Sequence, residues 1–260
     1  MAILNVTPDS FSDGGVHFDR DSAVEAALRM EQDGAAIIDV GGESTRPGSA
    51  EVPLDQELDR VVPVIVGIRK RSGVRISIDT RKAGVAAAAL DAGADIINDV
   101  SALRHDAEMR SLAAARRVPV ILMHMRGEPR TMQENPRYDD VVRDVARELE
   151  TWRDEAVAAG VDPANVLVDP GIGFGKTFEH NLELLAHCEE LTRIAPVVIG
   201  ASRKGFIGHL TGQPGGAPRM AGSLATVAAA HRGGAAIVRV HDVRETVDFL
   251  KVLSSIEARR

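Results

Sequence analysis

Short apolar runs rich in β-branched residues alternate along the chain with longer, alanine-rich stretches whose apolar positions recur with a helical period. The short runs have the length of strands, and the longer stretches have the length of helices. The predicted strands are 2–6, 35–40, 74–78, 94–98, 118–123, 165–168, 196–200 and 235–240. The predicted helices are 21–33, 54–72, 81–92, 106–116, 138–160, 178–193, 218–232 and 243–257.

This alternation predicts a parallel α/β fold, because strands joined through helices form βαβ crossovers. The segment Val197–Ile199 is continuously apolar, as is typical of a strand covered on both faces. The chain of 260 residues contains eight predicted strand–helix units, which is the number found in a closed (β/α)8 TIM barrel. A doubly wound open sheet also fits the alternation, although it usually has fewer strands. Without a linker or a longer repeat, we predict a single domain over residues 1–260.

The composition and net charge of the chain argue against several classes of function. A net charge of −7 argues against a general nucleic-acid binder, and 3% aromatic residues argue against single-strand binding by stacking. The single cysteine, Cys188, excludes an internal disulfide framework and fits a reducing cytoplasm. No apolar run approaches about 18 residues, so we expect no transmembrane span. The N-terminus lacks the basic and apolar regions of a signal peptide.

Polar side chains follow the carboxyl end of every predicted strand. In a barrel the active site lies at this end, because the loops after the strands converge there. For any single residue, the alternative explanation is that a polar side chain occurs there only because the buried core ends at that position. The whole set is harder to explain this way, because the opposite strand ends carry mostly glycine and alanine. The set comprises Asn5, Asp39, Asp79, Asn98, Asp99, His124, Asp169, Ser202, Arg203, Lys204, Arg239 and His241.

Three members of the set are hydrogen-bond acceptors, namely Asp79, Asn98 and Asp169. A carboxylate accepts two parallel bonds from neighbouring N–H groups, and such charge-assisted bonds are strong. These residues therefore predict recognition of a flat ring with paired N–H donors, for example the edge of an aminopyrimidine.

A second group consists of donors suited to phosphate or carboxylate: Arg46, Arg203, Lys204, Arg239 and His241. Asn5 offers a neutral oxygen that Mg²⁺ accepts, since this ion usually takes its other ligands from water and substrate phosphates. Together the two groups indicate a ring-bearing phosphoester as ligand. The alternatives are a salt bridge of Arg239 with an acid such as Asp242 and a structural role for His241.

The segment Val166–Thr177 reads V-L-V-D-P-G-I-G-F-G-K-T. Its last three residues resemble the end of a phosphate-binding P-loop, but that motif requires glycine where the chain has Pro170. What remains is a carboxylate, Asp169, and an aromatic residue, Phe174, on a tight glycine-rich turn. Lys176 first suggests a phosphate ligand, and the alternative is that it only stabilises the turn.

Other patterns give weaker signals. His124, His180 and His187 lack the spacing of zinc ligands, and Ser202 lacks the G-x-S-x-G context of a hydrolase nucleophile. Three long connections, 7–20, 41–53 and 126–137, follow strands. Structureless loops of about 12 residues in a compact domain are usually functional.

The ordered set of motifs resembles dihydropteroate synthases, a family of pterin-binding enzymes. The match runs from residue 3 to about 250, and every predicted strand contributes to it. Its segments are I-L-N-V-T-P-D-S-F-S-D-G-G (3–15), D-V-G-G-E-S-T-R-P-G (39–48), S-I-D-T (77–80), I-N-D-V-S (97–101), L-M-H-M (122–125), D-P-G-I-G-F-G-K (169–176), A-S-R-K (201–204) and R-V-H-D-V (239–243). I-N-D and S-I-D-T alone are shared with other pterin-binding barrels, whereas the whole set is specific.

The resemblance implies a (β/α)8 enzyme of folate biosynthesis. Such an enzyme joins 7,8-dihydropterin pyrophosphate to p-aminobenzoate, releases pyrophosphate and uses Mg²⁺. It also implies small-molecule substrates without nucleic acid or membrane, a homodimer and a cytoplasmic location. A pterin-binding methyltransferase is the alternative enzyme, although T-R-P-G, S-R-K and R-V-H-D argue against it because it binds no pyrophosphate. An inactive homologue that keeps only a pterin pocket is the alternative outside enzymes.

The resemblance also implies roles for individual residues. The implied pterin-binding residues are Asp79, Asn98, Met123, Asp169, Phe174 and Lys204. The implied pyrophosphate-binding residues are Asn5, Thr45, Arg46, Arg239 and His241, with Asn5 also at the metal. The implied p-aminobenzoate-binding residues are Phe11, Thr45, Pro47, Ser202 and Lys204. Asp79, Asp169 and Lys204 are the catalytic candidates, through binding and support of a pterin cation. Arg126 departs from the family, in which its position is often neutral.

Overall fold

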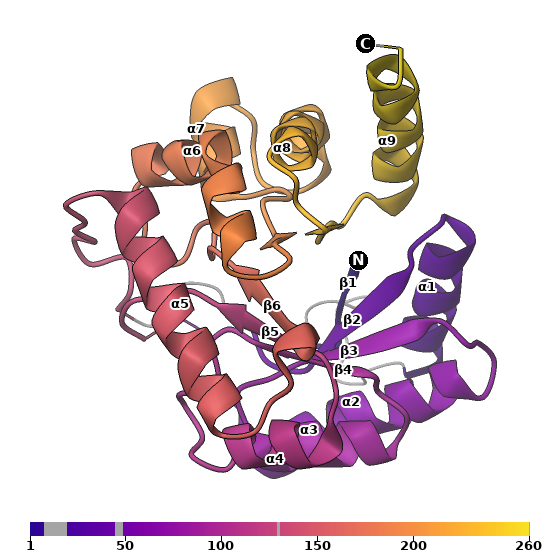
Figure 1. Cartoon of the computed structure of the whole chain (residues 1–260). Coiled ribbons are helices and arrows are strands. Elements are labelled where there is room, and N and C mark those ends of the chain that lie inside the picture. Colours follow the sequence, from indigo (N-terminus) through magenta and orange to yellow (C-terminus); the bar gives the residue numbers. More distant parts are fainter. Residues whose placement is uncertain (8–19, 45–48, 129–130, 260) are drawn as a thin grey trace.

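The computed structural model describes residues 1–7, 20–44, 49–128 and 131–259 (Figure 1). Its strands are β1 (Ala2–Asn5), β2 (Ile37–Gly41), β3 (Arg75–Asp79), β4 (Ile96–Asp99), β5 (Val120–Met123), β6 (Val166–Asp169), β7 (Val198–Ile199) and β8 (Ile237–Val238). Its helices are α1 (Arg20–Gln32), α2 (Leu54–Arg69), α3 (Ala83–Asp91), α4 (Met109–Arg116), α5 (Val141–Ala158), α6 (Phe178–Ala186), α7 (Gly205–Thr211), α8 (Met220–Arg232) and α9 (Val243–Glu257).

The strands form a closed ring. Strands β1 to β6 pair in parallel in chain order, and β7 pairs with β8. Backbone hydrogen bonds close both remaining seams: Val168 N–H donates to Pro196 O at 3.0 Å, and Ile3 N–H donates to Val240 O at 3.0 Å. The helices surround the strands in chain order (Figure 1). The predicted α/β class and TIM-barrel topology are thus confirmed, and the open sheet is excluded.

Successive side chains of each strand point alternately into the barrel and outward toward the helices, which gives two apolar layers. Some polar side chains also point into the barrel. One small cluster joins Ile37, Ile96, Ile121 and Val198, which come from different strands and so fill the barrel interior. The larger core packs the outward side chains of the strands against the helices. Asp39 lies two residues after Ile37 on the same side of β2, so its side chain also points into the barrel.

The structure differs from the predicted elements mainly after β6. The predicted helix 178–193 is divided into α6 and a 3-10 helix (Cys188–Arg193), because His187 leaves the helical conformation. A short helix that was not predicted, α7, follows β7 and ends at Gly212 with φ 69°. Its glycine content hides it from a pattern analysis, since glycine is a poor helix former. Within the described ranges, no helix has the length and apolar character needed to span a membrane.

Candidate active site

The strand register brings the predicted acceptors of β1, β3 and β4 into one row. Asn5 lies opposite Gly41, Gly41 opposite Asp79, and Asp79 opposite Asn98. A Cβ atom added to Gly41 would lie 3.4 Å from Cβ of Asp79, so the glycine makes room for that carboxylate. The row lies at the carboxyl end of the barrel, as the sequence predicted.

Arg239 extends from the end of β8 to two of these strands. Its Nε donates to Asp39 Oδ2 at 2.6 Å and its Nη2 donates to Asp79 Oδ2 at 2.8 Å. Nδ2 of Asn98 donates to Asp39 Oδ2 at 3.2 Å. Asp39 therefore connects β8 with β4 across the barrel, a role that its position at a strand end did not predict.

The ion pair with Asp242 belongs to Arg203 and not to Arg239. Nε of Arg203 donates to Asp242 Oδ2 at 3.0 Å. The alternative of a salt bridge between Arg239 and Asp242 is therefore wrong. Arg203 closes a contact between the loops after β7 and β8, and its side chain is 27% exposed.

Burial raises the pKa of Asp79 to about 7, assisted by the nearby Asp39 charge and opposed by Arg239. The 2.8 Å hydrogen bond from Arg239 favours the ionised carboxylate. The Arg239 guanidinium remains charged, because the pKa rise from Asp39 and Asp79 outweighs the opposing effect of its burial. Asp79 can thus change protonation near neutral pH when a charged or hydrogen-bonding ligand binds.

The loop after β6 holds Asp169 through its own backbone. Gly171 N–H donates to Asp169 Oδ1 at 2.7 Å. Gly171 has φ 67°, and a Cβ atom there would lie 2.0 Å from the carbonyl oxygen of His124, so only glycine fits. Burial raises the pKa of Asp169, while the Gly171 hydrogen bond and the nearby lysines Lys204 and Lys176 oppose this rise.

An apolar wall stands beside this carboxylate. Phe174 packs against a cluster of four buried residues, Val100, Met123, Met125 and Met132. Nζ of Lys204 lies 4.2 Å from the centroid of the Phe174 ring, the geometry of a cation–π contact. The structure thus brings together Met123, Phe174 and Lys204, which the sequence predicted to share a ligand.

Ser202 and His241 form one hydrogen-bonded unit. Oγ of Ser202 accepts from the backbone N–H of His241 at 3.2 Å and lies 3.1 Å from its Nδ1. Burial and the charges of Arg203 and Arg239 lower the pKa of His241 to about 4, so its imidazole is neutral at pH 7. A neutral imidazole carries a single N–H, so His241 offers one hydrogen-bond donor instead of a cation.

Two buried networks that the sequence did not predict support the site. Glu43, after β2, forms ion pairs with Arg81 and Lys82 and accepts from Val52 N–H at 3.1 Å. Nζ of Lys82 also donates to Glu57 at 2.6 Å. This cluster ties together the described ends of the long connection after β2. The predicted residues Thr45, Arg46 and Pro47 of that connection, and Phe11 after β1, lie outside the described residues.

The second network explains Arg126. Its Nε donates to Glu148 Oε1 at 3.0 Å, and its guanidinium carbon lies 4.1 Å from the centroid of Tyr138. His124 contacts the same carboxylate through Nε2 at 3.0 Å. Arg126 therefore forms an ion pair with an acid of α5 and has a structural partner.

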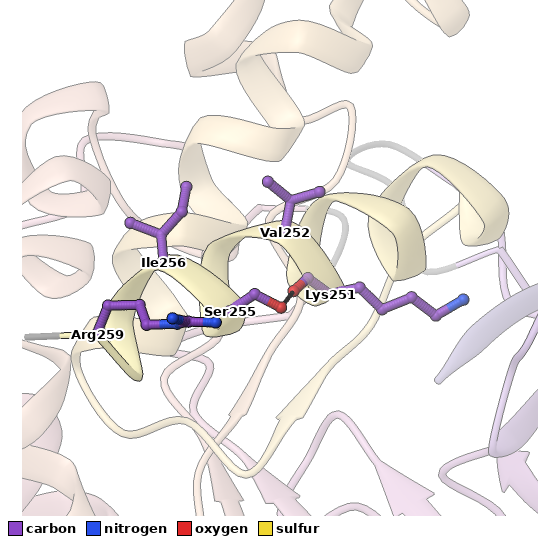
Figure 2. A pocket seen from close by; sticks show the side chains of 5 residues that line it. All are labelled: Lys251, Val252, Ser255, Ile256 and Arg259. Carbon is purple, nitrogen blue, oxygen red and sulfur yellow. Dashed lines mark hydrogen bonds between the residues drawn. The ribbon is translucent and has the colours of Figure 1, made fainter.

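A surface hollow on α9 offers no competing site. It is lined by Lys251, Val252, Ser255 and Ile256 of α9 and by Arg259 in the turn that follows (Figure 2). The Ser255 hydroxyl donates to the carbonyl of Lys251 at 2.7 Å, within the same helix. Among the described residues, no group of three acidic, histidine or cysteine side chains could hold a metal ion.

Comparison with known proteins agrees with this geometry. The family described as pterin binding enzyme matches residues 1–241. Dihydropteroate synthase of Escherichia coli K12 is 48% identical over 256 residues, which are 98% of this chain and 90% of that protein. Dihydropteroate synthase of Xanthomonas albilineans with 4-aminobenzoic acid superposes with a TM-score of 0.92 at 47% identity, covering 99% of this chain and 92% of that one. The same enzyme in complex with 7,8-dihydropteroate gives 0.89 at 45% identity, with coverage of 99% and 92%. The chain belongs to the pterin-binding enzyme family.

Proposed function

We propose that the chain is a dihydropteroate synthase, which condenses 7,8-dihydropterin pyrophosphate with p-aminobenzoate to 7,8-dihydropteroate and pyrophosphate. The observation that carries this proposal is the gathering of Asp79, Asn98 and Asp169 with Lys204 and Arg239 at one end of the barrel. A ring with N–H donors and an anionic tail has a complementary partner for each half in this arrangement.

The pterin lies between the β6 loop and the end of β5. Asp169, Asp79 and Asn98 accept or share hydrogen bonds with the edge of the ring, while Met123 and Phe174 cover its apolar faces. Lys204 reaches the ring from the side of Phe174, where its ammonium group lies 4.2 Å from the centroid of the phenyl ring. Aromatic and apolar walls with few polar groups are typical of small-ligand sites.

The pyrophosphate lies toward β1, β2, β7 and β8. Arg239 and the imidazole N–H of His241 supply donors there, and Thr45 and Arg46 complete the set from the connection after β2. The amide oxygen of Asn5 is a suitable ligand for Mg²⁺. One protein ligand suffices, because this ion keeps several waters and binds substrate phosphates. When bound, the ion supplies charge neutralisation for the departing pyrophosphate.

The chemistry is an ionisation followed by capture. The bond between the pterin methylene carbon and the pyrophosphate oxygen breaks, and both electrons leave with pyrophosphate. The amine of p-aminobenzoate then donates its lone pair to the methylene carbon, and its nitrogen releases a proton. Asp79 and Asp169 stabilise the cationic ring in their ionised forms, so the site requires no protein nucleophile.

The second substrate binds next to Lys204. Ser202 and Lys204 offer donors for the p-aminobenzoate carboxylate, with Phe11, Thr45 and Pro47 forming the rest of this subsite. We further propose a single-domain protein that works as a homodimer in the cytoplasm.

The decisive experiment mixes the purified protein with 7,8-dihydropterin pyrophosphate, p-aminobenzoate and Mg²⁺ and follows pyrophosphate release. Release should depend on the amine and should yield dihydropteroate by chromatography. Release that ignores the amine, or no release at all, would sink the proposal. Methyl transfer from methyltetrahydrofolate to a corrinoid in a parallel reaction would favour the methyltransferase instead.

A further inference from the structure

Lys176 is a buried cation that the proposed binding roles leave unused. Its side chain follows the glycine turn after β6, and the residue is only 3% exposed. Nζ contacts the carbonyl of Phe174 at 3.0 Å, Nδ1 of His124 at 3.1 Å and the carbonyl of His124 at 3.4 Å. All three contacts are to uncharged groups. A lysine in such surroundings requires an explanation, because burying an ammonium without a direct counter-ion is costly.

A neutral histidine links Lys176 to an acid. Burial and the neighbouring Lys176 charge lower the pKa of His124 to about 4, so the ring is neutral at pH 7. Its Nδ1 accepts from Lys176, and its Nε2–H donates to Glu148 at 3.0 Å. Glu148 is already paired with Arg126. The hydrogen bonds of Lys176 thus reach an acid through the imidazole of His124, and a second acid interacts with the ammonium charge without a hydrogen bond.

That second acid is Asp169. The turn places them close, because a Cβ atom on Gly171 would lie 3.5 Å from Nζ of Lys176, while Gly171 N–H donates to Asp169 Oδ1 at 2.7 Å. The backbone N–H of His124 also donates to the Asp169 carbonyl at 2.8 Å. Lys176 and Asp169 therefore both bond to His124, and both lie beside Gly171.

Charge interactions run in both directions between these groups. Burial lowers the pKa of Lys176 to about 7, and Asp169 is the strongest influence opposing that fall. Lys176 in turn opposes the rise that burial imposes on the pKa of Asp169. The other charged groups acting on this pair are Arg126, Glu148, Lys204 and Arg239.

We propose that Lys176 is a positioning residue of the pterin site: it fixes the glycine turn and adds its positive charge to those of Lys204 and Arg239, which favours Asp169 as an ionised acceptor. This inference rests on the proposed role of Asp169 in binding the ring. It deepens that role, because a deeply buried carboxylate accepts paired N–H groups well only when it is charged. A lysine that served the turn alone would influence binding equally at every pH.

The test is a comparison of pH profiles for pterin binding. Calorimetry with 6-hydroxymethylpterin measures the dissociation constant from pH 5.5 to 9 for the wild type, Lys176→Met, Asp169→Asn and the double variant. Methionine keeps the length and apolar stem of lysine but removes the charge. In Lys176→Met the acid limb of the profile should move to higher pH, with affinity falling about tenfold per unit of that shift. The two profiles should converge near pH 9, where Lys176 itself is neutral.

The double variant separates charge from structure. In the Asp169→Asn background, Lys176→Met should change affinity less than about twofold, because no charge remains to support. An equal loss of pterin affinity at every pH, or in both backgrounds, would mean that Lys176 only stabilises the turn. An unchanged affinity in Asp169→Asn alone would instead refute the ring-binding role in the proposed function. Lys251→Met, on the exposed face of α9, is the matched control and should leave the profile unchanged.

A second variant covers the case in which Lys176→Met fails to fold. Glu148→Gln keeps the lysine but removes the acid that compensates it through His124. The pKa of Lys176 should then fall further, and pterin affinity at pH 7 should drop while that at pH 5.5 remains near the wild-type value. Identical losses at pH 5.5 and pH 7 would contradict the proposal.

Discussion

Arg239 donates from Nε to the carboxylate of Asp39 at 2.6 Å, across the seam of the barrel and over a separation of 200 residues in the sequence. The Asp39 side chain is completely buried. A buried carboxylate is stable only with such a partner, because an unpaired charge in the interior is strongly destabilising. The pair therefore ties the last strand to the second and orients the guanidinium at the mouth of the barrel.

Asp39→Asn should lower the free energy of unfolding by about 3 kcal/mol, the lower end of the range for breaking a buried pair, since Arg239 keeps Asp79 as a partner. Urea unfolding followed by circular dichroism measures this change. Asp248→Asn is the matched control, because its pair with Lys251 is exposed on both sides and should contribute under about 1 kcal/mol. Equal losses of unfolding free energy in both variants would mean that the buried pair contributes no more to stability than an exposed one.

Asp169→Asn should weaken pterin binding by about 1.5–3 kcal/mol, the cost of losing a charge-assisted bond to the ring. The amide keeps the shape of the side chain, so the Gly171 N–H still has an acceptor. Calorimetry with 6-hydroxymethylpterin measures the loss. Asp162→Asn, in the turn before β6, is the control and should bind as the wild type does. A wild-type dissociation constant for Asp169→Asn would remove the carboxylate from the pterin site.

The fold was predictable because its signals are local. Each strand and helix needs only the apolar period within its own segment, and the count of these units leads to the barrel. Helix α7 escaped prediction, since Gly205 and Gly208 weaken the helical signal within its seven residues. The strand ends of Asp79, Asn98 and Asp169 were found in the same way, because the end of an apolar run can be read directly from the sequence.

Pairings between distant segments were not predictable. No local pattern indicates that Arg239 selects Asp39 over the nearby Asp242, or that Arg203 takes the latter. Likewise, Lys176 in the sequence suggested a phosphate ligand or a simple turn. Its burial against His124 depends on the closed barrel, which brings the ends of β5 and β6 together.

Gly171→Ala should be far more damaging than Gly212→Ala, although both positions have nearly the same backbone conformation, with φ 67° and 69°. The left-handed backbone alone costs about 1–2 kcal/mol for alanine. At Gly212 a Cβ atom meets nothing within 4 Å, whereas at Gly171 it lies 2.0 Å from the His124 carbonyl oxygen. Urea unfolding should place Gly171→Ala at least about 2 kcal/mol below Gly212→Ala. Similar stabilities would show that the β6 turn shifts freely, contrary to its role in holding Asp169.

Glu148→Gln should change stability in a pH-dependent way. Burial raises the pKa of Glu148, but hydrogen bonds and charges from His124 and Arg126 outweigh it and lower this pKa to about 2. A carboxyl whose pKa is depressed on folding contributes stability above its unfolded pKa, near 4.5, and loses it as pH falls through 2. Allowing for solvent screening, the wild type should exceed the variant by about 1–2 kcal/mol at pH 6.

The same difference should shrink between pH 4.5 and pH 2. Urea unfolding at pH 6, 4 and 3 measures it. Glu150→Gln, on the same helix and exposed, is the matched control, since its ion pair with Arg153 spans 3.6 Å. A difference between wild type and Glu148→Gln that stays constant down to pH 3 would contradict a depressed pKa for this acid.

Lys176→Met removes a buried charge that destabilises the fold, in contrast to the stabilising acid at Glu148. Burial lowers the pKa of Lys176 from 10.5 to about 7, so folding must desolvate or deprotonate the ammonium group. This cost is fully present below pH 7 and disappears as pH rises toward 10.5. The wild type should therefore gain stability over Lys176→Met by about 1.4 kcal/mol per pH unit between pH 7 and pH 9. Urea unfolding at pH 7, 8 and 9 measures the slope, with Lys251→Met as the exposed control. The hydrogen bonds lost in the variant change stability equally at every pH, so they do not affect the slope. A slope of zero would therefore mean that Lys176 keeps an ordinary pKa. Its charge would then be the same from pH 7 to pH 9 and could not make pterin binding depend on pH in this range.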